Sequence, residues 1–149
     1  MATYHVLVYR LGTKLFAVKR NSVVAIHPLT QSVSTEIDDL SRNIVGVIIT
    51  GKMNVPVFSI HEKLGLPAFK KTVNTKVIVI KVGQNLFGII ADQIPGIVKS
   101  SVTKPGSGHD LLISEEFIRA WASDGNQALP ILEWLEIFDP KAATEAVNS

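Results

Sequence analysis

The 149-residue chain contains no cysteine, which excludes disulfide bonds, thiolate nucleophiles and zinc sites built from cysteine. It has no uninterrupted apolar run near the roughly 18 residues of a membrane-spanning helix. Its first residues show no basic head followed by an apolar stretch, as a secretory signal would. We therefore expect a cytoplasmic protein without membrane insertion.

The chain also lacks a strong net charge, which is only +2. The charge is unevenly distributed, because residues 1–104 hold 13 Lys and Arg against 5 Asp and Glu, whereas residues 105–149 hold 2 against 8. Two interpretations remain open: the acidic end packs on the basic part, or the basic part faces a nucleic acid or an acidic partner. The 46% content of hydrophobic residues predicts a folded protein of one domain or two small ones.

An internal repeat is the main feature that is present. The stretch Lys76–Ile97 aligns with His5–Ile26 at an offset of 71 residues (76 − 5), and matching positions include Gly12 with Gly83 and Phe16 with Phe87. A second match, at an offset of 74 (129 − 55), relates Val55–Phe58 to Leu129–Leu132. The order is the same in both halves, so we infer a duplicated unit of about seventy residues.

Short runs of β-forming residues recur between turn residues throughout both halves. The expected strands cover residues 6–11, 15–18, 22–26, 45–49, 55–60, 77–82, 86–90, 94–98, 117–122 and 128–132. Pro56 lacks an N–H group, so the strand that contains it should lie at a sheet edge or begin unpaired. Residues 30–39 are polar and predict an exposed loop.

The stretch Ser114–Ser123 fits either a helix or a strand. As a helix it has an N-cap in Ser114 and an i,i+4 pair in Phe117 and Trp121. As a strand it alternates and leads through Asp124-Gly125 into another strand. The duplication favours the hairpin, because the first half has one at the same place. Short helical turns are expected at residues 60–64 and 133–138.

This pattern predicts an all-β protein built from small barrels or a sandwich. The halves would span residues 5–67 for the first unit and 76–138 for the second, followed by a flexible tail at 139–149. Units of this size are marginally stable alone, so they should share an apolar seam.

No catalytic constellation is evident in the sequence. The four histidines, His5, His27, His61 and His109, show no ligand spacing, and phosphate-binding and nucleophile motifs are absent. We therefore expect no enzymatic activity, no metal and no cofactor. Binding of single-stranded nucleic acid is an alternative for small barrels, although Phe16 and Phe87 stand beside apolar neighbours, which favours core packing.

Several segments, in this order, resemble the CheW-like domain family over about residues 5 to 138. They are Tyr9-x-Leu11-Gly12-x3-Phe16-Ala17-Val18, Gly46-Val47-Ile48 with Pro56-Val57-Phe58-x-Ile60, the stretch Leu86–Asp92, and the ending from Glu116-Phe117 through Leu129–Leu132. The resemblance implies two intertwined five-stranded barrels of the SH3 or OB type. It also implies a non-enzymatic adaptor that links chemoreceptors to a CheA-type histidine kinase within membrane-bound receptor arrays.

The resemblance also indicates candidate partner-binding residues. These are Val23 and Ile94, which match apolar positions of the family's groove, together with Asp92 and the turn Thr50-Gly51-Lys52. Where the family commonly has Asn-Leu-Arg-Gly, this chain has Ile49-Thr50-Gly51-Lys52. Ala25 and Ser59 stand at positions where the family commonly has acidic residues. Lys52 could replace the missing charge, although it cannot reproduce a bidentate arginine contact. An adaptor for a type IV pilus chemosensory system is the alternative within the family.

Overall fold

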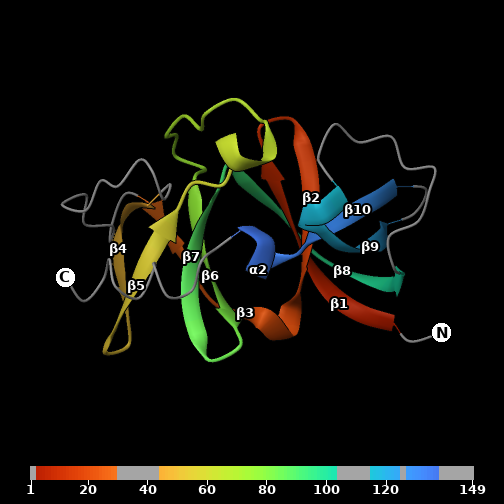
Figure 1. Cartoon of the computed structure of the whole chain (residues 1–149), viewed down its shortest axis with the longest axis horizontal. Coiled ribbons are helices and arrows are strands. Elements are labelled where there is room, and N and C mark those ends of the chain that lie inside the picture. The colour runs from red at the N-terminus through yellow and green to blue at the C-terminus, as the bar shows by residue number, and fades with distance from the viewer. Residues whose placement is uncertain (1–2, 30–43, 104–114, 125–126, 138–149) are drawn as a thin grey trace.

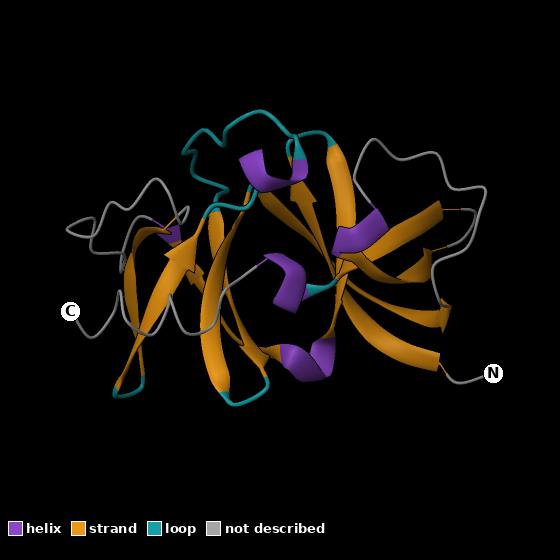
Figure 2. Cartoon of the chain, in the orientation of Figure 1, coloured by secondary structure: helices purple, strands orange, loops and turns teal. Residues whose placement is uncertain are grey.

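The computed structural model describes residues 3–29, 44–103, 115–124 and 127–137, which form ten strands and a few short helices (Figure 1). The strands are β1 (Thr3–Leu11), β2 (Lys14–Lys19), β3 (Val23–Pro28), β4 (Ile44–Thr50), β5 (Met53–Phe58), β6 (Lys76–Val82), β7 (Asn85–Ala91), β8 (Gln93–Thr103), β9 (Ile118–Asp124) and β10 (Gln127–Leu132). Three 3₁₀ turns, η1 (Arg20–Ser22), η3 (Glu62–Leu64) and η4 (Glu115–Phe117), and the helix α2 (Trp134–Ile137) complete it. The expected all-β fold is confirmed (Figure 2).

The two five-stranded units exchange strands between the halves of the chain. One is a closed barrel in the order β1-β2-β10-β9-β8, and the other is a sheet in the order β3-β6-β7-β5-β4. The first two strands of each repeat therefore join the last three strands of the other. The ranges 5–67 and 76–138 describe the repeat in the sequence, whereas each sheet draws strands from both.

The duplication extends to the pairing register. In the barrel, β10 runs parallel to β2 with Ile131 opposite Ala17, and in the other sheet β5 runs parallel to β7 with Val57 opposite Gly88. Val57 and Ile131 are 74 residues apart, and Ala17 and Gly88 are 71 apart, which are the two offsets of the repeat. Equivalent residues thus occupy equivalent places in two sheets of similar construction.

The sheets differ in closure. The barrel closes where β8 pairs with β9 at Val102 and Thr103, near the end of an eleven-residue strand. The equivalent strand, β3, ends at Pro28. The positions that correspond to Val102 and Thr103 lie beyond Pro28, outside the described residues.

Strands β1 and β6 are buried on both faces. In β1, Val6 and Val8 face the barrel interior, while Leu7, Tyr9 and Leu11 enter a core shared by the two sheets. In β6, Val77 and Val79 face the interior of their own sheet, and Ile78 and Ile80 enter the shared core. Strand side chains alternate between faces, so only a nearly continuous apolar run can satisfy both environments.

The structure confirms the expected C-terminal hairpin and both expected helical turns. Residues 118–124 and 127–132 form the predicted hairpin, and helical turns occur at Glu62–Leu64 and Trp134–Ile137. Of the two alternatives expected for the strand of Pro56, the edge position is wrong, because β5 lies between β4 and β7. The other alternative, an unpaired start, holds on the side of β7, where pairing begins only at Val57. On its other side the strand pairs with β4 from Met53 onwards. The loop expected at residues 30–39 and the tail at 139–149 lie outside the described residues.

Candidate partner-binding site

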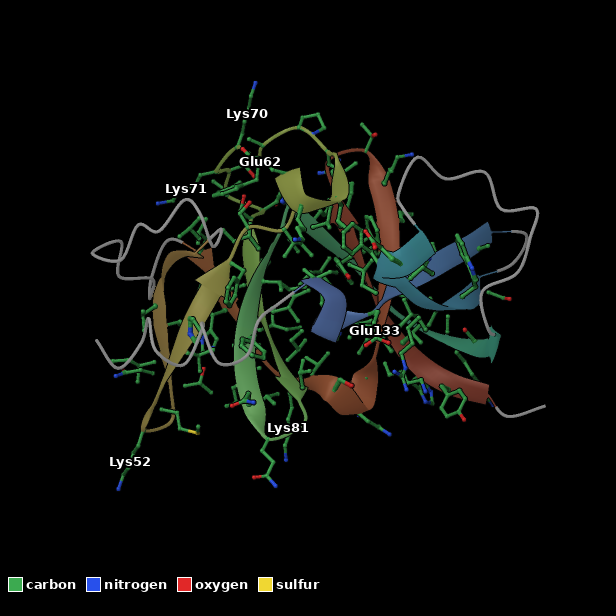
Figure 3. The ribbon with its side chains drawn as sticks, in the orientation of Figure 1. Lys52, Glu62, Lys70, Lys71, Lys81 and Glu133 are labelled. Atoms are coloured by element: carbon green, nitrogen blue, oxygen red, sulfur yellow. The ribbon has the colours of Figure 1, made fainter. Side chains whose placement is uncertain are left out.

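The predicted turn Thr50-Gly51-Lys52 forms the tip of the β4–β5 hairpin. Gly51 has a φ of 63°, a left-handed conformation that glycine adopts without steric cost. Lys52 extends from the tip away from the rest of the molecule (Figure 3). Two large apolar side chains flank the turn, with Ile49 64% exposed and Met53 52% exposed. Because Met53 pairs with Thr50 and Ile49 pairs with Asn54, the two apolar side chains lie on opposite faces of the hairpin, with the cation of Lys52 at its end.

Thr50 lies close to strand β3, which is the opposite edge strand of the same sheet. Its Oγ1 atom lies 3.4 Å from the Nε2 atom of His27. On the face of β3 opposite to His27, Val24 and Ile26 are 47% and 44% exposed. Sheet faces that expose several large apolar side chains are often contact surfaces for other proteins.

Val23 and Ile94, which are 71 residues apart, occupy equivalent positions in the two repeats. Both are partly buried and pack against the shared core. Val23 pairs with Ile80 of β6, whereas Ile94 follows Gln93, which pairs with Arg10 of β1. Each side chain thus divides its surface between the shared core and solvent.

Asp92 makes contacts inside the chain. Its Oδ2 atom accepts a hydrogen bond from the backbone N–H of Gly12 at 2.6 Å and lies 2.7 Å from the Nε2 atom of His61. Its own backbone N–H donates to the carbonyl oxygen of Arg10 at 2.9 Å. His61 is completely buried, and Asp92 is 15% exposed. Asp92 therefore fastens the β1–β2 turn and η3 to the corner between β7 and β8.

The candidate residues thus occupy three places. Thr50, Gly51 and Lys52 share the hairpin tip, Val23 and Ile94 border the shared core, and Asp92 lies at the β1–β2 turn. Sequence reasoning missed Ile49, Met53 and His61. The repeat gave no signal for them, and 31 residues separate His61 from Asp92.

The described residues contain neither a metal-binding cluster nor a membrane-spanning helix. No group of three or more His, Cys, Asp or Glu side chains is arranged to hold a metal ion. None of the helices in the described part of the chain is long and apolar enough to cross a membrane.

Strand exchange between two repeats around a shared core defines a class of two-sheet β-proteins. The model of the CheW-like domain matches residues 5–141, and the chain therefore belongs to the CheW-like domain family. A search of curated proteins found no match. Among solved structures, the chain is similar to scaffolding protein TtCheW from Thermoanaerobacter tengcongensis, with a TM-score of 0.76 and 17% identity. The similarity covers 89% of this chain and 90% of that one, and it shows a common fold.

Proposed function

We propose that this chain is a non-enzymatic cytoplasmic adaptor that links a chemoreceptor to a CheA-type histidine kinase. Membership of the CheW-like family supports the proposal, and so does the fold shared with a protein described as a scaffold. An adaptor acts by presenting surfaces to two partners at once, so its function depends on what its exposed strands offer.

The exposed apolar tip of the β4–β5 hairpin is the observation that carries this proposal. Ile49 and Met53 stand on either side of the turn, and neither belongs to the buried core. An apolar centre beside a charged rim is the usual composition of a protein–protein contact. Lys52 would supply the rim charge, and Ile49 and Met53, one on each face of the hairpin, would supply the buried area to a partner that encloses the tip.

Val23 and Ile94 would form a second contact of the adaptor. Their partial burial fixes each side chain against the shared core while leaving part of its surface accessible. A rigid apolar side chain loses little conformational entropy on binding, which favours docking of a receptor helix. Asp92 would contribute indirectly by holding the β1–β2 turn.

The alternative of single-strand nucleic-acid binding receives little support from the strand aromatics. Phe16 and Phe87 are 0% and 1% exposed, so neither ring is accessible to a base. Stacking on exposed aromatic rings is the main sequence-independent means by which such barrels hold single strands.

The proposal is tested by calorimetric titration of the chain with the regulatory domain of a CheA-type kinase from the same organism. Ile49→Asp and Met53→Asp should weaken binding by about tenfold each, because they place a charge in an apolar contact. Val73→Asp is the matched control, since Val73 is 87% exposed on the connector before β6 and its substitution should leave binding unchanged. Equal effects from all three substitutions would contradict the proposed surface. Titration with kinases of flagellar and pilus systems would distinguish the two pathways.

A further inference from the structure

A cleft of about 340 Å³ lies between the two sheets, on a different part of the molecule from the hairpin tip. Its apolar walls include Val18 of β2, Val82 of β6 and Trp134 of α2. Its charged residues come from both sheets, with Lys19 on β2, Lys81 on β6, and Arg119 and Glu133 near α2. Of the lining residues, Lys81 and Glu133 are labelled in Figure 3, where Lys52 is at the tip of the other hairpin.

The first cleft lies at the β6–β7 turn. A second cleft, of about 240 Å³, lies at the β1–β2 turn, which is the equivalent turn in the first repeat. Arg10 and Gly12 line that second cleft, and the equivalent residues 71 positions later, Lys81 and Gly83, line the first. The second cleft contains the carboxylate of Asp92, which Gly12 and His61 engage. The residue equivalent to Asp92 is Asn21 (92 − 71), so the repeat supplies no matching carboxylate to the larger cleft.

Among the described residues that line it, the larger cleft consequently has an excess of positive charge. The one carboxylate among these residues, on Glu133, is paired with Arg119 at 3.1 Å. Lys19 lines the cleft from β2, and its Nζ atom lies 4.7 Å from the centre of the Tyr4 ring of β1. Lys81 is exposed on the opposite wall. Two lysines, one from each sheet, thus line the cleft beside its apolar residues, and neither has a carboxylate partner among the described lining residues.

We infer that this cleft binds an acidic segment of a partner protein, one that inserts an apolar side chain between carboxylates. The apolar floor would bury the anchor, and Lys19 and Lys81 would each attract a carboxylate beside it. This surface is distinct from the β4–β5 tip and would allow the chain to hold a further partner. The inference stands independently of the identity of the proposed kinase and receptor.

The test uses two short fluorescein-labelled peptides with the same central leucines, flanked by glutamates in one and by lysines in the other. Fluorescence anisotropy should show saturable binding of the glutamate peptide only, weakening as salt rises because exposed charges are screened. Lys81→Glu should weaken binding by about tenfold, since it replaces an attraction by a repulsion. Lys52→Glu, the same charge change at the hairpin tip, should have no effect.

Amide chemical shifts locate the bound peptide. Binding in the cleft should shift the Gly83 resonance and leave the Gly51 resonance unchanged, since Gly83 lines the cleft and Gly51 lies at the tip of the β4–β5 hairpin. The inference is overturned if neither peptide binds, if both bind equally, or if Lys52→Glu and Lys81→Glu weaken binding alike. It is also overturned if Gly51 shifts in place of Gly83. Failure of the kinase titration with success here would reject only the proposed function.

Discussion

Gly88 lies where two side chains from neighbouring strands leave no space for a methyl group. A Cβ atom there would come within 2.9 Å of Val77 Cγ1 and 3.1 Å of Val57 Cγ2. Ala17 occupies the equivalent position in the barrel, where it is fully buried and opposite Ile131. The repeat therefore keeps a small residue at both parallel pairings, and Gly88 is the more tightly restricted of the two.

We predict that Gly88→Ala lowers the free energy of unfolding by about 1–3 kcal/mol, because the added methyl forces Val77 and Val57 to move. The reciprocal variant Ala17→Gly should cost less, about 0.5–1 kcal/mol, through added backbone freedom in a strand. Urea unfolding of both variants measures the difference. A Gly88→Ala protein as stable as the parent would contradict this packing.

Tyr9 is fully buried in the shared core, where its ring stacks on Phe16 at 5.7 Å between centroids. Its hydroxyl group has no hydrogen-bond partner among the described residues. Desolvation by burial raises the pKa of Tyr9 far above its ordinary value. The unfolded chain would therefore release the phenolic proton at a pH where the folded chain keeps it.

We predict that Tyr9→Phe raises the free energy of unfolding at neutral pH by about 1 kcal/mol, because it removes an unsatisfied buried hydroxyl. The raised pKa adds a pH dependence. Below pH about 10, the pKa of tyrosine in the unfolded chain, the phenol is protonated in both states; above it the unfolded chain releases this proton, so the parent protein loses stability as the pH rises. The advantage of the variant should consequently grow above that pH. Unfolding curves at neutral and alkaline pH test this, and a gap that narrows with pH would refute it.

At the scale of elements, the sequence predicted where the strands lie better than which of their side chains are buried. Turn residues and apolar runs located both repeats, and the duplication resolved the ambiguity at residues 114–123. In a continuous apolar run such as residues 47–49, however, the pattern does not show which side chain faces solvent. Ile48 is fully buried and Ile49 is 64% exposed, a difference that the register of the hairpin decides.

The bounds of β8 and the position of β5 depended on neighbours that the sequence does not reveal. The strand expected at residues 94–98 runs from Gln93 to Thr103, because it pairs first with β1 and then with β9. Pro56 suggested an edge strand or an unpaired start, and β5 lies inside its sheet with its pairing to β7 beginning at Val57. In both cases, a strand from the other half of the chain determined part of the result.

The contact between His61 and Asp92 connects three elements, and its removal should be costly. We predict that Asp92→Ala lowers the free energy of unfolding by about 2 kcal/mol, since the Gly12 N–H and the buried His61 ring both lose their acceptor. Glu62→Ala, next to His61 but exposed (Figure 3), should change stability by less than about 0.5 kcal/mol. Chemical denaturation of both variants compares them, and equal stabilities would contradict the structural role of Asp92.

For the whole molecule, the sequence repeat alone could not predict that the two halves exchange strands. Pairing within each half and pairing between halves satisfy the same apolar pattern, and only the resemblance to the CheW-like family implied intertwined barrels. The partner-binding residues were likewise proposed from that resemblance. The structure brings Thr50, Gly51 and Lys52 together at a single tip and places Asp92 elsewhere.

Strand exchange predicts that neither half folds alone. A chain divided in the exposed connector at Val73 would give one fragment with β1–β5 and another with β6–β10. Each fragment lacks strands from both sheets, so each should show no cooperative unfolding by circular dichroism, whereas the mixture should recover it. Independent folding of either fragment would contradict the observed topology.

The most direct test of the adaptor proposal is size-exclusion chromatography with light scattering of three components. These are the full chain, a CheA-type kinase and the cytoplasmic fragment of a chemoreceptor, all from the same organism. We predict one species that contains all three proteins and that loses the kinase when Ile49→Asp replaces the parent chain. Elution of this chain apart from both partners would contradict the account.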